Sequence, residues 1–201
     1  MSRAPEAAYI AFEGDRCIGS GELRDVAGFA RAALGRQPHA SILIFNGHTS
    51  ALVDVDFRGS VDDVVARIPL PAAPTADEDP ADTTPRGRGR PKLGVVAREI
   101  TLLPRHWDWL AQQKGGASVA IRRLVDDARR NNEGSDRIRL AQEAAYRFMS
   151  TMAGNRPHFE EAIRALFAGD VKRFEQLIAE WPADVRDHAG RLADPAFQRK
   201  P

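Results

Sequence analysis

The 201-residue sequence predicts an α+β protein built from several small parts rather than one continuous domain. Three observations predict this class. Strand-like and helical patterns alternate near the N-terminus, a stretch rich in proline and charge follows, and the C-terminal third has helical patterns alone. Apolar residues make up 43% of the chain and charged residues 28%, which is the composition of a globular protein.

Residues 1–68 are predicted to form a small domain with the element order ββαββα. Two strand candidates, YIAF and CIGSGEL, flank the turn signal EGDR, and Asp25 is placed to cap a helix that ends near Gly35. The buried-strand run SILIF, an Asn-Gly turn and the alternating run ALVDVDF predict a hairpin. Ser60, with Asp63 three positions later, has the form of a capping box that opens the last helix.

Residues 69–93 have the composition of a disordered linker. Six prolines lie in this stretch, and no aromatic or long apolar side chain occurs between Leu70 and Lys92. Such a segment cannot bury enough apolar surface to order itself. Its first half is acidic and its second half is basic.

Residues 94–132 are predicted to form a strand–helix–helix unit. The β-like run VVAREITLL leads to Pro104, which suits the first turn of a helix because its missing N–H would lack a partner there anyway. Gly115 and Gly116 are expected to end that helix, and Ser118 to cap the next one.

The C-terminal region, residues 133–201, is predicted to be helical. One helix begins at Ser135 or Asp136 and ends before the sequence NRP. Gly169 ends the second helix and Asp170 caps the third, after which Pro182 interrupts the pattern and a short helix follows.

The net charge of +1 conceals a separation of charge along the chain. Residues 1–84 carry 7 Lys/Arg against 13 Asp/Glu, residues 85–130 carry 11 against 4, and residues 131–201 carry 11 of each. Positive charge is therefore concentrated in one middle segment, which favours an anionic partner such as DNA.

The basic half of the linker, TPRGRGRPKLG, resembles an AT-hook, the motif in which an extended segment lies in the minor groove of A·T-rich DNA. That groove is narrow and strongly negative, so it attracts inserted arginine side chains. Glycine leaves room for the groove walls, and proline keeps the backbone extended. The resemblance implies DNA contacts from Arg86, Arg88, Gly89, Arg90, Pro91 and Lys92.

The next segment, REITLLPRHWDWLAQQKGGASVAIRRLVDDARR, resembles a ribbon-helix-helix DNA-binding domain. In that family two chains pair their strands into a ribbon that enters the major groove, and the N-terminus of the second helix holds a phosphate. The resemblance implies an obligate homodimer. It also implies base contacts from Arg98 and Thr101, phosphate contacts from Ser118 and Arg122, and a core of Ile100, Leu103, Trp107, Leu110, Ile121, Leu124 and Val125.

Two leucines before Pro104 leave the register of this strand open. In one register Ile100 and Leu102 face the core, and the alternating residues Glu99 and Thr101 point at DNA. A shift of one residue reverses every side chain and turns Arg98 toward DNA. A bulge at the two leucines would reconcile the registers.

The whole chain also looks like a family of uncharacterised bacterial proteins of about this length. The resemblance is carried by the turn VDFRG at residues 55–59 and by the stretch from RGRGRP through LLPRHWDWLAQQ. It implies no particular activity.

No pattern points to catalysis, to a cofactor or to a bound metal. The histidines at 39, 48, 106, 158 and 188 lack metal-ligand spacing, and neither a nucleophile elbow nor a phosphate-binding loop occurs. Asp54 and Asp56 lie on one face of a predicted strand and are interpreted as solvated. Cys17 has no partner for a disulfide.

Neither an apolar run of membrane-spanning length nor a signal peptide is recognised, so a cytoplasmic location is expected. Together these patterns predict a homodimeric, nucleoid-associated DNA-binding protein with a preference for A·T-rich DNA. It is expected to regulate transcription rather than to be an enzyme. The alternative is a protein–protein interaction adaptor with a basic linker, but an adaptor has no need to collect positive charge in one segment.

Overall fold

The computed structural model describes residues 8–69 and 98–198 of the chain. Two compact units divide the molecule. Residues 1–69 and 132–201 form the first unit, and residues 70–131 form the second. The second unit is therefore inserted into the sequence of the first. The predicted linker at 69–93, including the AT-hook-like run, lies outside the described residues apart from its first position.

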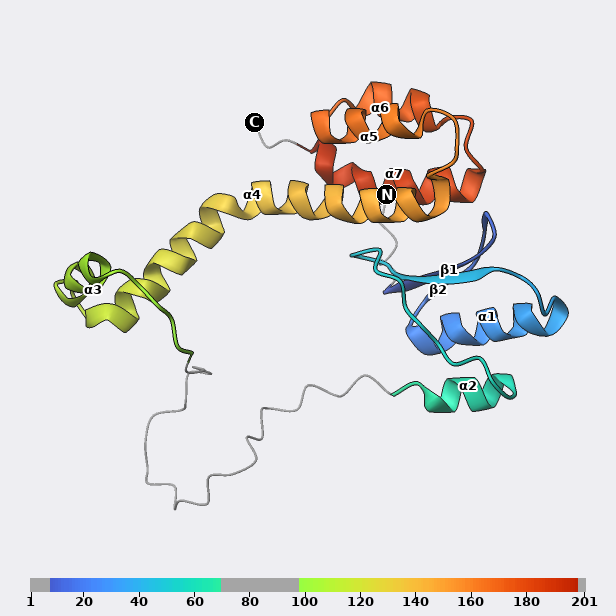
Figure 1. Ribbon diagram of the computed structural model, residues 1–201, viewed down its shortest axis with the longest axis horizontal. Helices are drawn as coiled ribbons and strands as arrows, with labels where there is room; N and C mark the ends of the chain where they lie inside the picture. Colours follow the sequence, from blue (N-terminus) through green and yellow to red (C-terminus); the bar gives the residue numbers. More distant parts are fainter. Residues whose placement is uncertain (1–7, 70–97, 199–201) are drawn as a thin grey trace, which may run out of the picture. The chain divides into compact units, whose positions relative to one another are not determined.

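The first unit contains a three-stranded antiparallel sheet with the order β2-β1-β3 (Figure 1). Its strands are β1 (Tyr9–Glu13), β2 (Arg16–Gly21) and β3 (Ile42–Asn46), and β1 pairs with both neighbours. The turn between β1 and β2 contains Gly14, whose φ of 56° suits glycine.

The fourth strand predicted over ALVDVDF does not form. Leu52 makes a single bridge to Phe45, and the amide of Val53 donates to the carbonyl of Ile44 at 2.8 Å. Beyond that point the carboxylate of Asp56 accepts a hydrogen bond from the amide of Arg58 at 3.1 Å. This local side-chain bond competes with strand pairing and turns the chain toward the next helix.

Helices cover both faces of the sheet (Figure 1). Helix α1 (Leu23–Arg36) packs on one face through a cluster that includes Ala11 and Ile44, and α2 (Val61–Arg67) packs on α1. Successive side chains of a strand point to opposite faces, so Ile10 and Phe12 of β1 face the C-terminal helices instead.

The start of α1 differs from the prediction, whereas the start of α2 confirms it. Glu22, not Asp25, occupies the N-cap position of α1 and makes no side-chain capping bond. At α2 the hydroxyl of Ser60 accepts from the amide of Asp63 at 3.2 Å, and the Asp63 carboxylate accepts from the amide of Ser60 at 2.8 Å. This reciprocal pair is the predicted capping box.

The C-terminal helices are α4 (Gly116–Ala153), α5 (Phe159–Ala168), α6 (Val171–Ile178) and α7 (Ala183–Phe197). As predicted, Gly169 ends α5 in the left-handed conformation, and Asp170 caps α6 by accepting from the amide of Arg173 at 3.0 Å. The two helices predicted on either side of residues 131–134 are one helix, because the only strong helix breaker there is Gly134. A single glycine costs a helix only about 1 kcal/mol.

The main core of the first unit joins its two sequence segments. Phe12 of β1 and Phe45 of β3 meet Phe148 of α4 with ring centroids 5.4 Å and 5.2 Å from it. The amide of Cys17 in β2 donates to the carboxylate of Asp184 in α7 at 2.8 Å. The division of the sequence into an N-terminal domain and a separate helical region does not anticipate this shared core.

Candidate functional site

The predicted site residues fall into two groups. The described residues include Arg98, Thr101, Ser118 and Arg122, all exposed and all in the second unit. The AT-hook-like group lies outside the described residues: Arg86, Arg88, Gly89, Arg90, Pro91 and Lys92.

Residues 98–103 form no strand in the described part of the chain. Their side chains nevertheless alternate. Ile100 and Leu102 line one hollow of the second unit, while Thr101 between them is exposed and does not line it. Leu103 has extended backbone and its carbonyl accepts from the amide of His106 at 2.8 Å, so the segment leads directly into a helix.

Helix α3 (Pro104–Ala111) begins with the predicted proline in its first turn. The side chains at His106, Trp109 and Leu110 share one face because positions three and four apart are neighbours on a helix. Trp107, expected in the core, is 42% exposed and lies outside the lining of the hollow. Trp109 lines the hollow, although it is 48% exposed.

A glycine turn connects α3 to α4. Gly115 and Gly116 have φ angles of 90° and 76°, a conformation that favours glycine. A Cβ on Gly115 would lie 3.1 Å from the side chain of Val119, which is tighter than ordinary contact. Helix α4 starts at Gly116, so Ser118 lies inside the first turn rather than at the predicted N-cap position.

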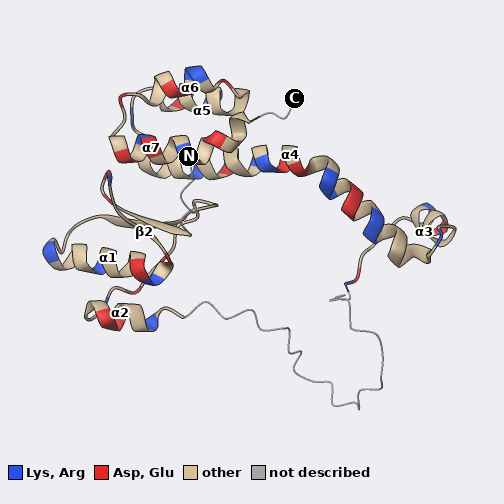
Figure 2. Cartoon of the chain, turned by 180° about the vertical axis from the view of Figure 1, so that it is seen from behind, with Lys and Arg blue, Asp and Glu red and all other residues tan. Residues whose placement is uncertain are grey.

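The first turns of α4 carry charge on their exposed surface. The Nε of Arg122 donates to the carbonyl of Ser118 at 3.2 Å. Farther along, Arg130 forms an ion pair with Asp127. Figure 2 shows basic and acidic residues following one another along α4. Arg122 thus lies one turn from the amide groups at the start of the helix, which carry a partial positive charge.

The described residues of the second unit enclose an apolar hollow of about 430 Å³. It is bounded by the segment before α3, by α3 itself and by the first part of α4. Its lining consists of Ile100, Leu102, His106, Trp109, Leu110, Ile121, Leu124, Val125 and Ala128.

These lining side chains are poorly covered. Ile100, Trp109, Leu124 and Val125 are between 47% and 51% exposed. Among residues 98–131 only Leu110 and Ala120 are buried. The ribbon-helix-helix resemblance implied five of the lining residues as core, and one of the two strand registers implied Leu102 as well. It gave no such role to His106, Trp109 or Ala128, and it placed Leu103 and Trp107 in the core, although both are exposed.

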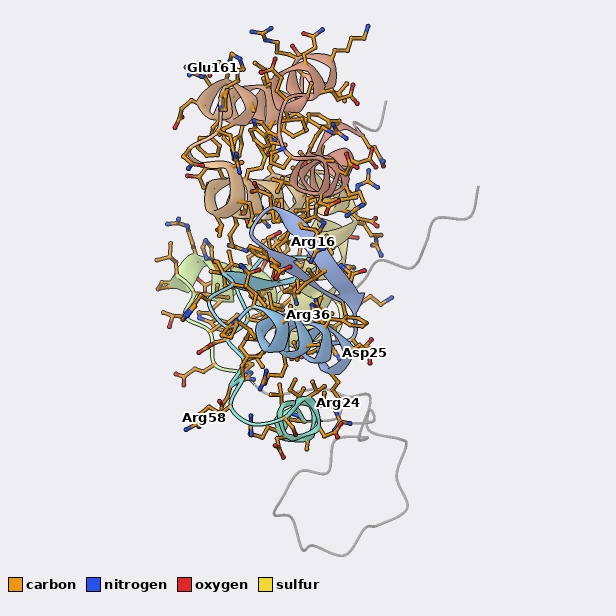
Figure 3. All side chains as sticks on the ribbon, turned by 90° about the vertical axis from the view of Figure 1, so that its right-hand side faces the viewer. Arg16, Arg24, Asp25, Arg36, Arg58 and Glu161 are labelled. Atoms are coloured by element: carbon orange, nitrogen blue, oxygen red, sulfur yellow. The ribbon has the colours of Figure 1, made fainter. Side chains whose placement is uncertain are left out.

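The first unit holds two further groups of ionisable side chains. Arg58 donates to the carboxylate of Asp56 at 2.7 Å, which together with Arg67 keeps the pKa of Asp56 well below its ordinary value. Arg58 extends outward from the loop before α2 in Figure 3. Asp56, which the sequence placed on a solvated strand face, is therefore engaged in ion pairs.

His188 of α7 is buried in the core of the first unit. Its ring lies 4.5 Å from Phe148 and 5.8 Å from Phe12, centroid to centroid. Burial and, to a smaller degree, the nearby Arg191 lower the pKa of His188 to about 4. The imidazole is therefore neutral near pH 7.

Two other kinds of site are absent from the described residues. No cluster of three or more His, Cys, Asp or Glu side chains suited to a metal ion occurs within residues 8–69 and 98–198. In the same ranges, none of the helices has the length and apolar character required to span a membrane.

Comparison with known proteins identifies a family but no characterised relative. The comparison with curated proteins gives no match, and the comparison with solved structures gives none. A family model matches residues 8–193, which include both units of the structure. The chain therefore belongs to the family described as "Uncharacterized protein conserved in bacteria (DUF2239)".

Proposed function

We propose that this protein binds double-stranded DNA as a homodimer and regulates transcription at the nucleoid. The observation that carries the proposal is the concentration of positive charge in residues 85–130. This segment contains 11 Lys/Arg and only 4 Asp/Glu, although the whole chain has a net charge of +1. Each cation that neutralises a DNA phosphate releases a counterion, so such a segment supplies most of the affinity for DNA.

The homodimer forms through the apolar hollow of the second unit. Support comes from the exposed lining, in which Trp109, Leu124 and Val125 are each close to half exposed. A second copy brings an identical apolar surface, and a two-fold axis lets the same patch cover itself. The unpaired segment at residues 98–103 then pairs with its own copy as an antiparallel ribbon.

The ribbon lies in the major groove and reads base edges with its outward side chains. Because Ile100 and Leu102 both line the hollow, alternation places Thr101 on the opposite side with Glu99. Thr101 is the better supported of the two proposed base contacts. Arg98 lies two and four positions before Ile100 and Leu102, so alternation turns its side chain to the same face as theirs. We therefore assign Arg98 to the end of the ribbon, where it contacts the neighbouring phosphates.

Two further groups hold the DNA backbone and the minor groove. The amide groups at the start of α4, around Ser118, bind one phosphate, and Arg122 pairs with the same phosphate or its neighbour. The AT-hook-like run reaches the minor groove through Arg88 and Arg90, with Lys92 on the phosphates. Only a few residues separate this run from the ribbon. Binding of one to DNA therefore raises the effective concentration of the other at the adjacent groove.

A binding titration on A·T-rich and mixed-sequence duplexes at several salt concentrations tests the proposal. Replacing Arg88, Arg90 and Lys92 together with alanine removes three cations. The slope of log K against log salt should then become shallower by about two to three. Arg90→Ala alone should weaken binding more on A·T-rich than on mixed DNA.

Arg173→Ala is the matched control, because Arg173 is an exposed cation of the first unit on α6. It should leave the slope unchanged. Binding no tighter than millimolar at low salt, or an unchanged slope in the triple variant, would refute DNA binding and favour an interaction adaptor.

A further inference from the structure

We propose that the middle of α4, residues 128–136, is a joint that opens by local unfolding while both units of the structure stay folded. This motion goes beyond the proposed function and does not depend on DNA binding. Helix α4 runs without interruption through residues 131 and 132, where the second unit ends and the first resumes. A helix that opens at this place lets each unit move without disturbing the core of the other.

The joint lacks the tertiary packing that stabilises the ends of α4. From residue 128 to residue 136 no side chain is buried, and every residue except Gly134 is exposed. On one side of the joint Ala120 is buried. On the other side Arg137 donates to the carbonyl of Gln198 at 3.4 Å. Most helical stability in proteins comes from packing, and an isolated helix of fewer than about 12 residues is marginal in water.

The ion pairs of the joint are local as well. Arg130 pairs with Asp127, and Asp136 pairs with Arg139 at 3.2 Å, so all four side chains belong to α4. Exposed pairs at this spacing stabilise a helix only weakly. Directly after the joint, Ile138 packs against the main core of the first unit. The joint is therefore held by its own residues, whereas the next turn is held by the core.

Those residues are poor helix formers. The run from residue 131 to residue 136 reads NNEGSD. Asparagine, serine and aspartate side chains offer the backbone alternative hydrogen bonds, and glycine gains the most conformational freedom when a helix opens. Of the six, Glu133 alone favours a helix strongly. Low propensity and missing packing thus coincide in one stretch of α4.

Gly134 is required neither by space nor by backbone conformation. Apart from its chain neighbours and its own helical backbone, a Cβ built on it would meet no heavy atom within 4 Å. Its backbone is helical, and it is not among the glycines with positive φ. Alanine would fit at this position and would strengthen the helix. The glycine instead suits a helix that opens.

Hydrogen–deuterium exchange of the full chain, followed by mass spectrometry, measures this opening. Amides of residues 131–136 should exchange at least about a hundredfold faster than those of residues 144–152, whose helical turns pack on the core. Gly134→Ala should slow exchange in the joint by about fivefold, which is the difference in helix propensity between glycine and alanine.

Gly190→Ala is the matched control. Gly190 lies in α7, which packs on the core through Ala189 and Ala193, and a Cβ built on it also meets no heavy atom within 4 Å. This variant makes the same substitution in a helix of the first unit and should leave exchange in the joint unchanged.

Limited digestion of the folded chain with trypsin is the second measurement, because a protease cuts only a stretch that has unfolded. Cleavage after Arg130 should be much faster than cleavage after Arg147, which is also exposed but lies in the packed part of α4. Gly134→Ala should slow the cut after Arg130 by about fivefold.

Three results would overturn the joint. The first is equal exchange of residues 131–136 and 144–152 in the wild-type chain. The second is an unchanged rate in Gly134→Ala. The third is an equal slowing in Gly190→Ala, which would trace the effect to global stability. The salt titration on DNA decides the proposed function separately.

Discussion

At the scale of single residues, His188 shows how burial by distant parts of the chain sets protonation. Phe12 and Phe148, which flank its ring, come from β1 and α4. The side chain of Arg191 lies 3.3 Å from its Nδ1. An N–H of Arg191 can donate to Nδ1 when the ring is neutral, and the same positive charge opposes protonation.

The stability of the first unit should therefore depend on pH. In the unfolded chain His188 takes up a proton near its ordinary pKa of 6.5, but in the folded protein only near a pKa of about 4. Between these values the unfolded state binds more protons, so stability falls as the pH falls. The loss should be about 1.4 kcal/mol per pH unit and reach about 3 kcal/mol by pH 4.

Urea unfolding of wild type and His188→Phe at pH 7.5, 5.5 and 4.5 measures this loss. Phenylalanine keeps an aromatic ring and removes the titration, so its stability should fall less across the range. Parallel stability curves for the two proteins would contradict the role of His188.

At the same scale, the sequence predicted the role of a residue correctly where that role depends only on residues close to it in the chain. Pro104 lies in the first turn of a helix and Gly169 at the end of one, as local backbone rules require. The burial of His188 and the lining position of Trp109 depend on segments elsewhere in the chain. The resemblance placed Trp107 in the core, but Trp109 lines the hollow, because the segment before α3 and the first part of α4 decide which face of α3 the hollow covers.

At the scale of elements, the start of a helix was predictable where a capping side chain accepts a hydrogen bond from the amide three residues later. Ser60 and Asp170 are the two examples. The predicted break in α4 was wrong because helix continuity depends on the sum of many residues rather than on Gly134. The missing fourth strand has a similar cause. An alternating run predicts a strand, but Asp56 bonds to the amide of Arg58 instead of leaving it for a sheet.

The capping box of α2 gives a prediction at this scale. Ser60→Ala removes the hydroxyl that accepts from the Asp63 amide, and it should lower the free energy of unfolding by about 1 kcal/mol. Ser20→Ala, at an exposed position of β2, is the matched control and should change stability by less than about 0.5 kcal/mol. Chemical unfolding of both variants measures the difference. Equal stabilities of the two variants would show that the box contributes nothing.

At the scale of the whole molecule, the second unit is inserted between two segments that fold together. The sequence predicted the parts of this arrangement and located the basic segment from charge alone. It could not predict that β1 and β3 share a core with α4 and α7, because contacts between residues more than 100 positions apart leave no local pattern. The lining of the apolar hollow was predictable in part: Ile100, Leu110 and Leu124 belong to the core that the ribbon-helix-helix resemblance implied, whereas His106 and Trp109 do not.

The stoichiometry of the DNA complex tests most directly whether the protein is a homodimeric DNA-binding protein. The mass of the complex between the full chain and a short A·T-rich duplex can be measured by sedimentation at pH 8.0 and low salt. Two chains per duplex is the expected result, and Leu124→Glu, which places a charge in the lining of the hollow, should abolish that complex. One chain per duplex at saturation, or no complex at any protein concentration, would contradict the proposed function.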